Sequence, residues 1–133
     1  MSILVSGGAG YIGRPLCPEL AGLGRETVVI DNLTTGFRWA LPSTARLIVG
    51  DIGDQDLVRT AIDRYGVTAV IHFAGSIVVP ESVADPLGYY FNNTVKSRAL
   101  IEAAVRSGVP HFIFSSTAPV YGLAKAMPVR ETT

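Results

Sequence analysis

Closely spaced glycines near the start of the chain could bind a phosphate group. Residues 7–13 read GGAGYIG, which contains Gly8-x-Gly10-x-x-Gly13 and the wider pattern Gly7-x-x-Gly10-x-x-Gly13. Glycine has no Cβ, so it permits a tight turn and lets the backbone approach a ligand closely. Where such a loop joins a strand to a helix, free N–H groups and the partial positive charge of the helix attract phosphates. The loop therefore predicts a site for the pyrophosphate of a dinucleotide. A glycine-rich turn with a purely structural role is the alternative.

An aspartate at the end of the second apolar run indicates which dinucleotide is bound. Asp31 directly follows the run 27–30. A carboxylate at this point of a dinucleotide-binding fold accepts hydrogen bonds from the adenosine ribose hydroxyls, and it repels a 2′-phosphate. The sequence therefore predicts NAD, rather than NADP, as the cofactor.

Short apolar runs alternate with helix-like segments that must position these residues. The runs cover residues 3–5, 27–30, 47–49, 69–73 and 112–114, and such near-continuous apolar runs are typical of strands buried on both faces. Helices are expected over about residues 11–23, 54–65 and 86–107, the second with Asp54 as N-cap and Gly66 as its end. This alternation predicts the α/β class, with a doubly wound parallel sheet of the Rossmann type. Within it, His72 is expected in the core and Trp39 under the loop that follows the second strand.

Two prolines interrupt the first expected helix. Pro15 lies near the first turn, where a missing N–H matters little. Pro18 lies deeper, where a proline removes a backbone hydrogen bond and costs about 3 kcal/mol. Because the phosphate-facing turn precedes both prolines, we expect dinucleotide binding to persist on a weakened helix.

The composition is that of a globular protein and argues against several classes. Of 133 residues, 48% are hydrophobic and 17% charged, and 11 Lys and Arg balance 11 Asp and Glu. A net charge near zero argues against nucleic acid as the main partner. No apolar run approaches the ~18 residues of a membrane span. Cys17 has no second cysteine to pair with, which suits a reducing compartment. We expect a cytoplasmic protein without a nucleic-acid or membrane partner and without a metal site.

Five stretches together resemble the extended short-chain dehydrogenase/reductase family and, within it, the UDP-glucose 4-epimerases. They are SGGAGYIG, DNL, GDI, IHFAGSIVVPESVADPLGYYFNN and FIFSSTAPVYG, in family order and at family spacing. The resemblance implies an NAD-dependent isomerase of galactose metabolism that interconverts UDP-glucose and UDP-galactose. It also implies that residues 1–133 form the NAD-binding Rossmann-type domain, incomplete because the last strands and the C-terminal substrate domain would follow it.

The resemblance also implies roles for single residues. Asp31 and Asn32 would bind the adenosine ribose. The Asp51 carboxylate would accept a hydrogen bond from the exocyclic amine of adenine, and Ile52 would pack on the ring. The other positions would contact the pyrophosphate, the nicotinamide-side ribose or the nicotinamide pocket, and they are Gly7, Gly10, Tyr11, Ile12, Gly13, Phe73, Ala74, Gly75 and Asn92. Taken singly, Asp51, Phe73 and Asn92 also suit structural roles.

In the resembled family, a tyrosine phenolate takes the proton of the sugar 4-hydroxyl while C4 gives hydride to NAD. The 4-keto sugar then takes the hydride back on its other face. A Ser or Thr hydroxyl bonds the sugar O4 and relays its proton, and a lysine one turn after the tyrosine lowers the pKa of the phenol. Ser115-Ser116-Thr117 matches the hydroxyl motif, and Thr117 is the expected catalytic residue. A polar loop residue bonded to local backbone is its structural alternative.

A Y-x-x-x-K pattern at Tyr121 and Lys125 is rejected as the catalytic pair. Residues four apart share a face only on a helix, and Gly122 and Pro128 indicate a loop instead. In the resembled family the pair comes some tens of residues later, which would place it after Thr133. We therefore expect the 133-residue chain alone to be inactive, with its UDP-sugar substrate bound in the full-length protein.

Other functions stay open at this stage. Sugar-nucleotide 4,6-dehydratases and decarboxylases share the glycine loop and the hydroxyl motif with the epimerases, and differ from them in the substrate domain. A non-catalytic dinucleotide-binding module, which senses NAD or works with a partner, is the alternative from another class. Members of the resembled family commonly dimerise through helices of this half, so the resemblance implies a homodimer as one assembly.

Overall fold

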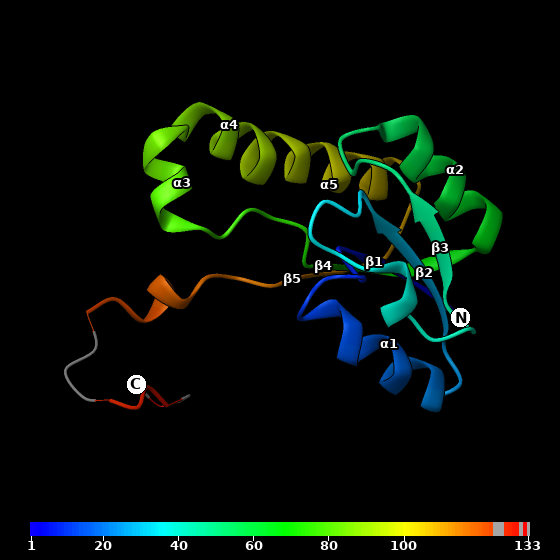
Figure 1. The fold of residues 1–133 in the computed structure, drawn as a ribbon. Coiled ribbons are helices and arrows are strands. Elements are labelled where there is room, and N and C mark those ends of the chain that lie inside the picture. Colours follow the sequence, from blue (N-terminus) through cyan, green and yellow to red (C-terminus); the bar gives the residue numbers. More distant parts are fainter. Residues whose placement is uncertain (124–126, 131, 133) are drawn as a thin grey trace.

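The strands form one parallel sheet, which is central to the fold (Figure 1). The computed structural model describes residues 1–123, 127–130 and 132. The strands are β1 (Ser2–Ser6), β2 (Glu26–Asp31), β3 (Arg46–Val49), β4 (Val67–His72) and β5 (His111–Phe114). Their order across the sheet is β3-β2-β1-β4-β5. The parallel, doubly wound sheet expected from the alternating runs is confirmed.

Helices connect the strands as crossovers. Besides short 3-10 turns, they are α1 (Gly13–Gly22), α2 (Gln55–Tyr65), α3 (Val79–Ala84), α4 (Pro86–Tyr90) and α5 (Lys96–Arg106). A π-helical turn (Phe91–Val95) joins α4 to α5, so the expected helix over 86–107 is one helical path with a wider turn inside it. The sequence pattern did not predict α3. No helix within the described ranges is both long and apolar enough to cross a membrane.

Two separate hydrophobic cores hold the helices on opposite faces of the sheet (Figure 1). Successive side chains of a strand point to opposite faces. Leu4 of β1 therefore packs with residues of α2 and α5, whereas its neighbours Ile3 and Val5 pack with α1. The central strands are thus covered on both sides, as their near-continuous apolar sequences predict.

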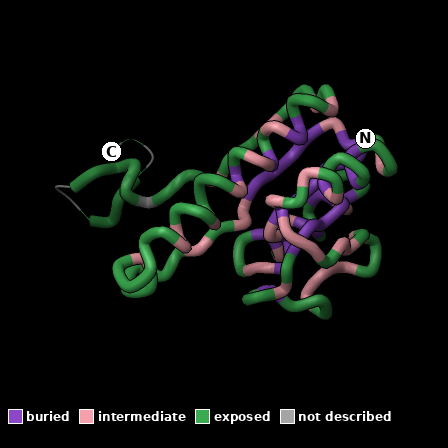
Figure 2. Tube along the Cα trace, turned by 90° about the horizontal axis from the view of Figure 1, so that it is seen from above, coloured by how far each residue is buried: buried purple, intermediate pink, exposed green. Residues whose placement is uncertain are grey.

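The edge strands differ from this expectation. Val49 of β3 is 48% exposed, and Ile113 and Phe114 of β5 are 55% and 61% exposed. Each edge strand has a neighbouring strand on one side only, which leaves its side chains more exposed. The apolar runs of the edge strands resemble those of the buried strands, so the sequence did not reveal this exposure. Figure 2 shows buried residues concentrated in the body of the sheet and exposed ones along the chain after β5. The expectation for Trp39 was also wrong, because its side chain is 76% exposed and stacks beside Phe37.

Local signals set the ends of α2 as predicted. The Asp54 carboxylate accepts a hydrogen bond from the backbone N–H of Leu57, at 3.0 Å, and so caps the start of α2. Gly66 ends the helix in the left-handed region at φ 59°. The first helix continues to Gly22 although Pro18 lies inside it.

Candidate functional site

The strand order reverses between β1 and β4, so the loops after these two strands leave the sheet at the same edge. From β1 the chain crosses to β2 on one side, and β4 lies on the other side. In such sheets the loops that leave the two central strands separate at this point, and ligands bind between them. The loop after β1 carries the glycines and the loop after β4 carries Phe73, Ala74 and Gly75. The fold thus brings together two predicted groups of site residues that are far apart in the sequence.

The two loops touch at a glycine. Gly7 has φ +70°, and a Cβ there would lie 2.7 Å from the backbone nitrogen of Ala74. The backbone N–H of Phe73 donates to the carbonyl of Ser6 at 3.0 Å, which ties the second loop to the end of β1. Beside them, Gly75 is exposed and faces the Asn93 side chain. A side chain at residue 7 would therefore force the loops apart.

The rest of the glycine loop leads tightly into α1. The N–H of Gly10 donates to the carbonyl of Gly7 at 3.1 Å, and a Cβ at Gly13 would lie 2.5 Å from the Cα of Gly8. Tyr11 and Ile12 are exposed at the turn. No side chain caps the start of α1, and its first turn holds no acidic residue. This arrangement fits a pyrophosphate, because the first N–H groups of the helix face no competing carboxylate.

Asp31 connects the end of β2 to the glycine loop. Its buried carboxylate accepts hydrogen bonds from the N–H of Ala9 at 3.0 Å and from the N–H of Leu33 at 2.8 Å. Asn32 beside it uses its side-chain oxygen to accept from the N–H of Thr34, at 3.0 Å. Asp31 therefore orders the glycine loop, an organising contact that the sequence pattern did not predict; its predicted role at the adenosine ribose stays a prediction.

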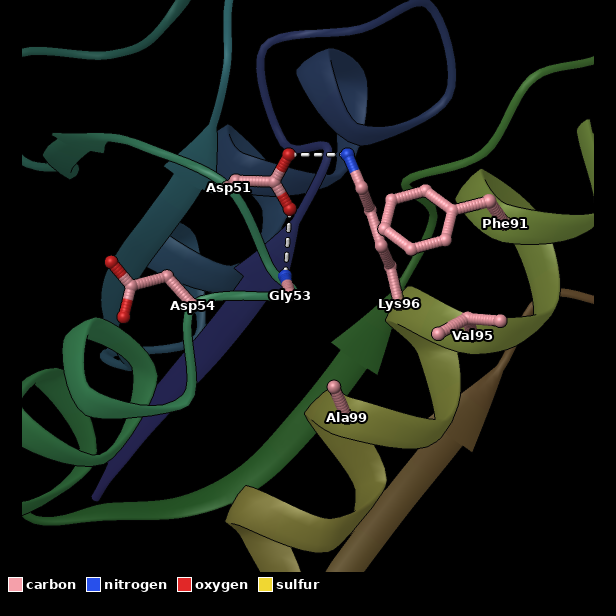
Figure 3. Close-up of a pocket in the computed structure, with 7 residues that line it drawn as sticks. All are labelled: Asp51, Gly53, Asp54, Phe91, Val95, Lys96 and Ala99. Carbon is pink, nitrogen blue, oxygen red and sulfur yellow. Dashed lines mark hydrogen bonds and ion pairs between the residues drawn. The ribbon is translucent and has the colours of Figure 1, made fainter. Parts of the chain in front are cut away.

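A cavity of about 350 Å³ lies between the loop after β3 and the start of α5 (Figure 3). Its lining residues are Asp51, Gly53, Asp54, Phe91, Val95, Lys96 and Ala99. Asp51 accepts a hydrogen bond from the N–H of Gly53 at 2.7 Å and pairs with the ammonium of Lys96. Burial raises the pKa of the Asp51 carboxyl, but these hydrogen bonds and the charge of Lys96 outweigh it, so the pKa is lowered overall. Ile52, predicted beside Asp51, is buried in the core instead of lining this cavity.

The π-helical turn holds the loop after β4 through two asparagines. The Asn92 side chain donates to the hydroxyl of Ser76 at 2.8 Å. Asn93 accepts from the N–H of Ser76 at 2.7 Å and donates to its carbonyl at 2.9 Å. Such wider turns often occur at functional sites because they reorient side chains. The sequence analysis singled out Asn92 but missed Asn93 and Ser76. Two adjacent asparagines are weak helix formers, so their presence inside an expected helix could have indicated the irregular turn.

His72 is buried beneath the site, in a chain of hydrogen bonds. The Ser97 hydroxyl donates to the carbonyl of Asn93 at 2.6 Å, so it accepts from His72 Nε2–H at 2.7 Å. His72 Nδ1 then accepts from the hydroxyl of Ser6, at 2.6 Å. Burial lowers the pKa of His72, which favours the neutral ring that this pattern requires. The expectation of a core histidine is confirmed, and the network joins β1, β4 and α5 under the two loops.

The hydroxyl motif follows β5. The N–H of Ser115 donates to the carbonyl of His72 at 3.2 Å, which continues the alignment of β5 with β4. Thr117 is exposed in extended conformation before a 3-10 turn (Ala118–Tyr121), and its hydroxyl has no hydrogen bond within the described part of the chain. Tyr121 ends this turn and Gly122 follows with φ +64°, so Tyr121 is not on an α-helix. Lys125 lies outside the described residues.

Known proteins that the chain resembles in sequence and fold include UDP-glucose 4-epimerases. A UDP-glucose 4-epimerase of Azospirillum brasilense is 49% identical over 97% of this chain and 37% of its own length. The crystal structure of UDP-glucose 4-epimerase from Brucella ovis in complex with NAD has a TM-score of 0.89 at 40% identity, over 98% of this chain and 40% of that one. The structure of UDP-glucose 4-epimerase with UDP-glucose from Thermotoga maritima has a TM-score of 0.88 at 34% identity, over 99% and 43% of the two chains.

The chain thus spans about two fifths of the length of these relatives. A family model, described as the NAD dependent epimerase/dehydratase family, matches residues 3–133. This match covers the glycine loop, the sheet and the loop that carries Thr117. The chain belongs to the NAD dependent epimerase/dehydratase family.

Proposed function

We propose that residues 1–133 are the NAD-binding domain of a UDP-glucose 4-epimerase. The observation that carries this proposal is the contact between the glycine loop and the loop after β4, at the point where the strand order reverses. Only a backbone without Cβ fits at Gly7, and the adjacent start of α1 has no acidic side chain. A pyrophosphate between the two loops meets N–H groups and the positive end of a helix dipole.

The predicted residues then have distinct tasks in binding NAD. The loop positions Gly7, Gly10, Tyr11, Ile12 and Gly13 surround the pyrophosphate, and Phe73, Ala74, Gly75 and Asn92 face the nicotinamide half. Asp31 accepts from the ribose hydroxyls with the oxygen lone pairs that the backbone leaves free, and Asn32 lies beside it. Asp51 accepts from the adenine amino group at the cavity between β3 and α5. Ile52 supports that end of the site from the core.

The activity proposed for the whole protein is the interconversion of UDP-glucose and UDP-galactose. NAD supplies the hydride acceptor for reversible oxidation at C4 of the sugar. Thr117 contributes a hydroxyl that binds the sugar O4 and passes on its proton. Its exposed, extended position and its hydroxyl without a partner among the described residues support this role. Tyr121 is not assigned as the general base, because the turn that carries it is not α-helical.

Partners and compartment follow from the same proposal. The substrate is a UDP-sugar, supported by the relative whose structure contains UDP-glucose. A homodimer is proposed as the assembly. Cys17 is a free, buried thiol, and burial raises its pKa to about 11, so it is a packing residue rather than a nucleophile. A free cysteine suits the reducing cytoplasm, where we place the protein.

Binding of NAD to the 133-residue chain tests the proposal directly. We expect isothermal titration calorimetry to show NAD binding at least about tenfold tighter than NADP binding, because a 2′-phosphate would approach the Asp31 carboxylate. Asp31→Asn should weaken NAD binding and reduce this preference. Asp63→Asn is the matched control, since Asp63 is an exposed aspartate on α2. A chain that binds neither cofactor would overturn the proposal.

A further inference from the structure

The His72 ring joins three elements directly beneath the two loops of the proposed site. His72 is the last residue of β4 and is 1% exposed. Its Nδ1 accepts from the hydroxyl of Ser6, the last residue of β1, and its Nε2–H donates to the hydroxyl of Ser97 on α5. Gly7 follows Ser6 in the chain, and Phe73 follows His72. One ring therefore fixes the points from which both loops leave the sheet.

The same network reaches the far end of the loop after β4. The Ser97 hydroxyl donates to the carbonyl of Asn93 at 2.6 Å. The Asn93 side chain in turn bonds the N–H and the carbonyl of Ser76, at 2.7 and 2.9 Å. The loop after β4 is thus attached to His72 at its start through the backbone, and at its end through Ser97 and Asn93.

The surroundings of the ring suit a neutral imidazole and not a charged one. Phe112 and Phe114 of β5 lie beside it, with ring centres 6.2 and 5.7 Å from that of His72. The cations on the first turn of α5, Lys96 and Arg98, each pair with a carboxylate on their own side of the helix or beyond it. No charged side chain bonds to the His72 ring within the described part of the chain. A protonated ring would therefore be a buried charge without a counterion.

Protonation would also break the hydrogen bonds between β4 and β1. Nδ1 would become a donor, so the Ser6 hydroxyl would have to turn and accept from it. The hydroxyl proton would then lose its acceptor, and a buried donor without an acceptor costs free energy. Water can relieve this cost only if the ends of β1 and β4 move apart. Such a movement would disturb the close contact between Gly7 and Ala74.

We infer that His72 is a positioning residue of the dinucleotide site, whose neutral ring holds the loops after β1 and β4 in the arrangement that binds NAD. The inference rests on the proposed NAD site. His72 acts through Ser6 and Ser97, because its buried ring is enclosed by protein. NAD should therefore bind the neutral form more tightly than the protonated form. By linkage, bound NAD should lower the pKa of His72 further than burial already does.

The pH dependence of NAD affinity tests this inference. Dissociation constants are measured by calorimetry at about pH 7.5 and about pH 5, and circular dichroism establishes that each variant is folded at both. The apparent constant rises as the fraction of the binding-competent, neutral form falls. We expect the unsubstituted chain to bind NAD at least about threefold more weakly at the lower pH. In His72→Asn, which cannot titrate at this position, the change should be less than about 1.5-fold.

The second histidine supplies the matched control. The chain has two histidines, and His111 is exposed at the start of β5. His111→Asn should show the same pH dependence of NAD affinity as the unsubstituted chain. A measurement on the unsubstituted chain tests the inference even if His72→Asn does not fold. NMR titration of the two histidine rings should show a lower pKa for His72 with saturating NAD than without it.

Several results would overturn the inference while leaving NAD binding intact. They are an equal NAD affinity at both pH values, an undiminished pH dependence in His72→Asn, and a His72 pKa that NAD does not change. Unfolding of the unsubstituted chain at about pH 5 would overturn it too, because His72 would then support the whole fold rather than the site. If the unsubstituted chain binds no NAD at about pH 7.5, the proposed function fails, and the inference fails with it.

Discussion

Single side chains at the site act largely by holding loops in place. The Asp31 carboxylate orders the glycine loop through Ala9, and the two asparagines of the π-helical turn hold Ser76 after β4. His72 lies beneath them and satisfies two buried hydroxyls at once. A buried polar group costs free energy unless it is hydrogen-bonded. Each of these side chains therefore links the geometry of the site to the stability of the fold.

The His72 network predicts a pH-dependent loss of stability. The pKa of His72 is lowered in the folded chain, whereas an unfolded histidine has a pKa of about 6.5. The unfolded state therefore binds the proton more readily. The stabilisation is fully present above about pH 6.5 and is lost as pH falls through the lower pKa of the folded chain. Urea unfolding between pH 5 and pH 8 measures this free energy of unfolding.

Substitution of each histidine separates this contribution from that of other titrating groups. The chain has two histidines, and His111 is exposed at the start of β5. We expect His72→Asn to make the free energy of unfolding less dependent on pH below about pH 6.5. The slope should fall by at most ~1.4 kcal/mol per pH unit, the contribution of one proton. His111→Asn should leave it unchanged. A flatter pH dependence in His111→Asn, with no change in His72→Asn, would show that His72 does not cause the loss of stability at low pH.

At the scale of elements, the site depends on how closely the loops after β1 and β4 approach and on how α1 begins. Gly7 allows the approach, and the uncapped start of α1 leaves N–H groups for a ligand. Further along α1, Pro18 lacks the N–H that would bond to the preceding turn. The loop contact should affect both NAD binding and stability, whereas Pro18 should affect stability alone. The two features can therefore be tested separately.

Substitution of two glycines by alanine separates backbone strain from loop contact. Gly7 and Gly24 have φ of +70° and +69°, but only Gly7 has atoms within reach of a Cβ. Gly24→Ala should cost about 1–2 kcal/mol of unfolding free energy, the strain of a left-handed residue. Gly7→Ala should cost more, by about 1–3 kcal/mol for the added clash with Ala74, and should abolish NAD binding. Equal losses in chemical denaturation would contradict the proposed loop contact.

Replacement of the prolines of α1 tests whether the helix is weakened. Pro18→Ala restores a backbone donor inside the helix and should raise the free energy of unfolding by about 1–3 kcal/mol. Pro15→Ala is the matched control, and it should change stability by less than about 1 kcal/mol because Pro15 lies in the first turn. NAD affinity should change by less than about twofold in both, since the phosphate-facing turn precedes them. A stability gain at Pro15 alone would refute this account.

On the scale of the whole molecule, the described chain combines a covered centre with exposed edges. The central strands lie between two cores, and the proposed cofactor site is at their carboxyl ends. The edge strand β5 leads into the exposed segment with Thr117 and Tyr121. The proposed cofactor site thus depends on the well-packed centre, whereas the residues proposed to meet the sugar lie at the edge.

This separation predicts cofactor binding without turnover for the 133-residue chain. Incubated with NAD and UDP-galactose, the chain should form no UDP-glucose above a protein-free control, as followed by chromatography. The reason is that Tyr121 ends a 3-10 turn and Gly122 follows it with φ +64°, so the described residues around Tyr121 do not form the α-helix on which a residue four positions later would share its face. Sustained conversion that disappears in Tyr121→Phe would instead identify Tyr121 as the general base.

The amino-acid sequence alone determined the features that depend on neighbouring residues. The alternation of apolar runs with helix-like segments, the glycine spacing and the caps of α2 are local. The alternation was sufficient to predict the class of fold, and the glycine spacing was sufficient to predict the position of the phosphate-binding turn. The fold and the caps are confirmed. The roles of the individual cofactor-binding residues stay predictions.

Only the tertiary structure decided the relations between distant residues. Lys96 meets Asp51 because the start of α5 packs beside the loop after β3, Asn93 meets Ser76 because the π-helical turn lies against the loop after β4, and His72 meets Ser6 because β4 pairs with β1. No periodicity in the sequence encodes such pairs. The strand order likewise decided that β3 and β5 are edges, although their apolar runs resemble those of the buried strands. Local propensity sets each element, but burial and pairing depend on which neighbours the packed chain supplies.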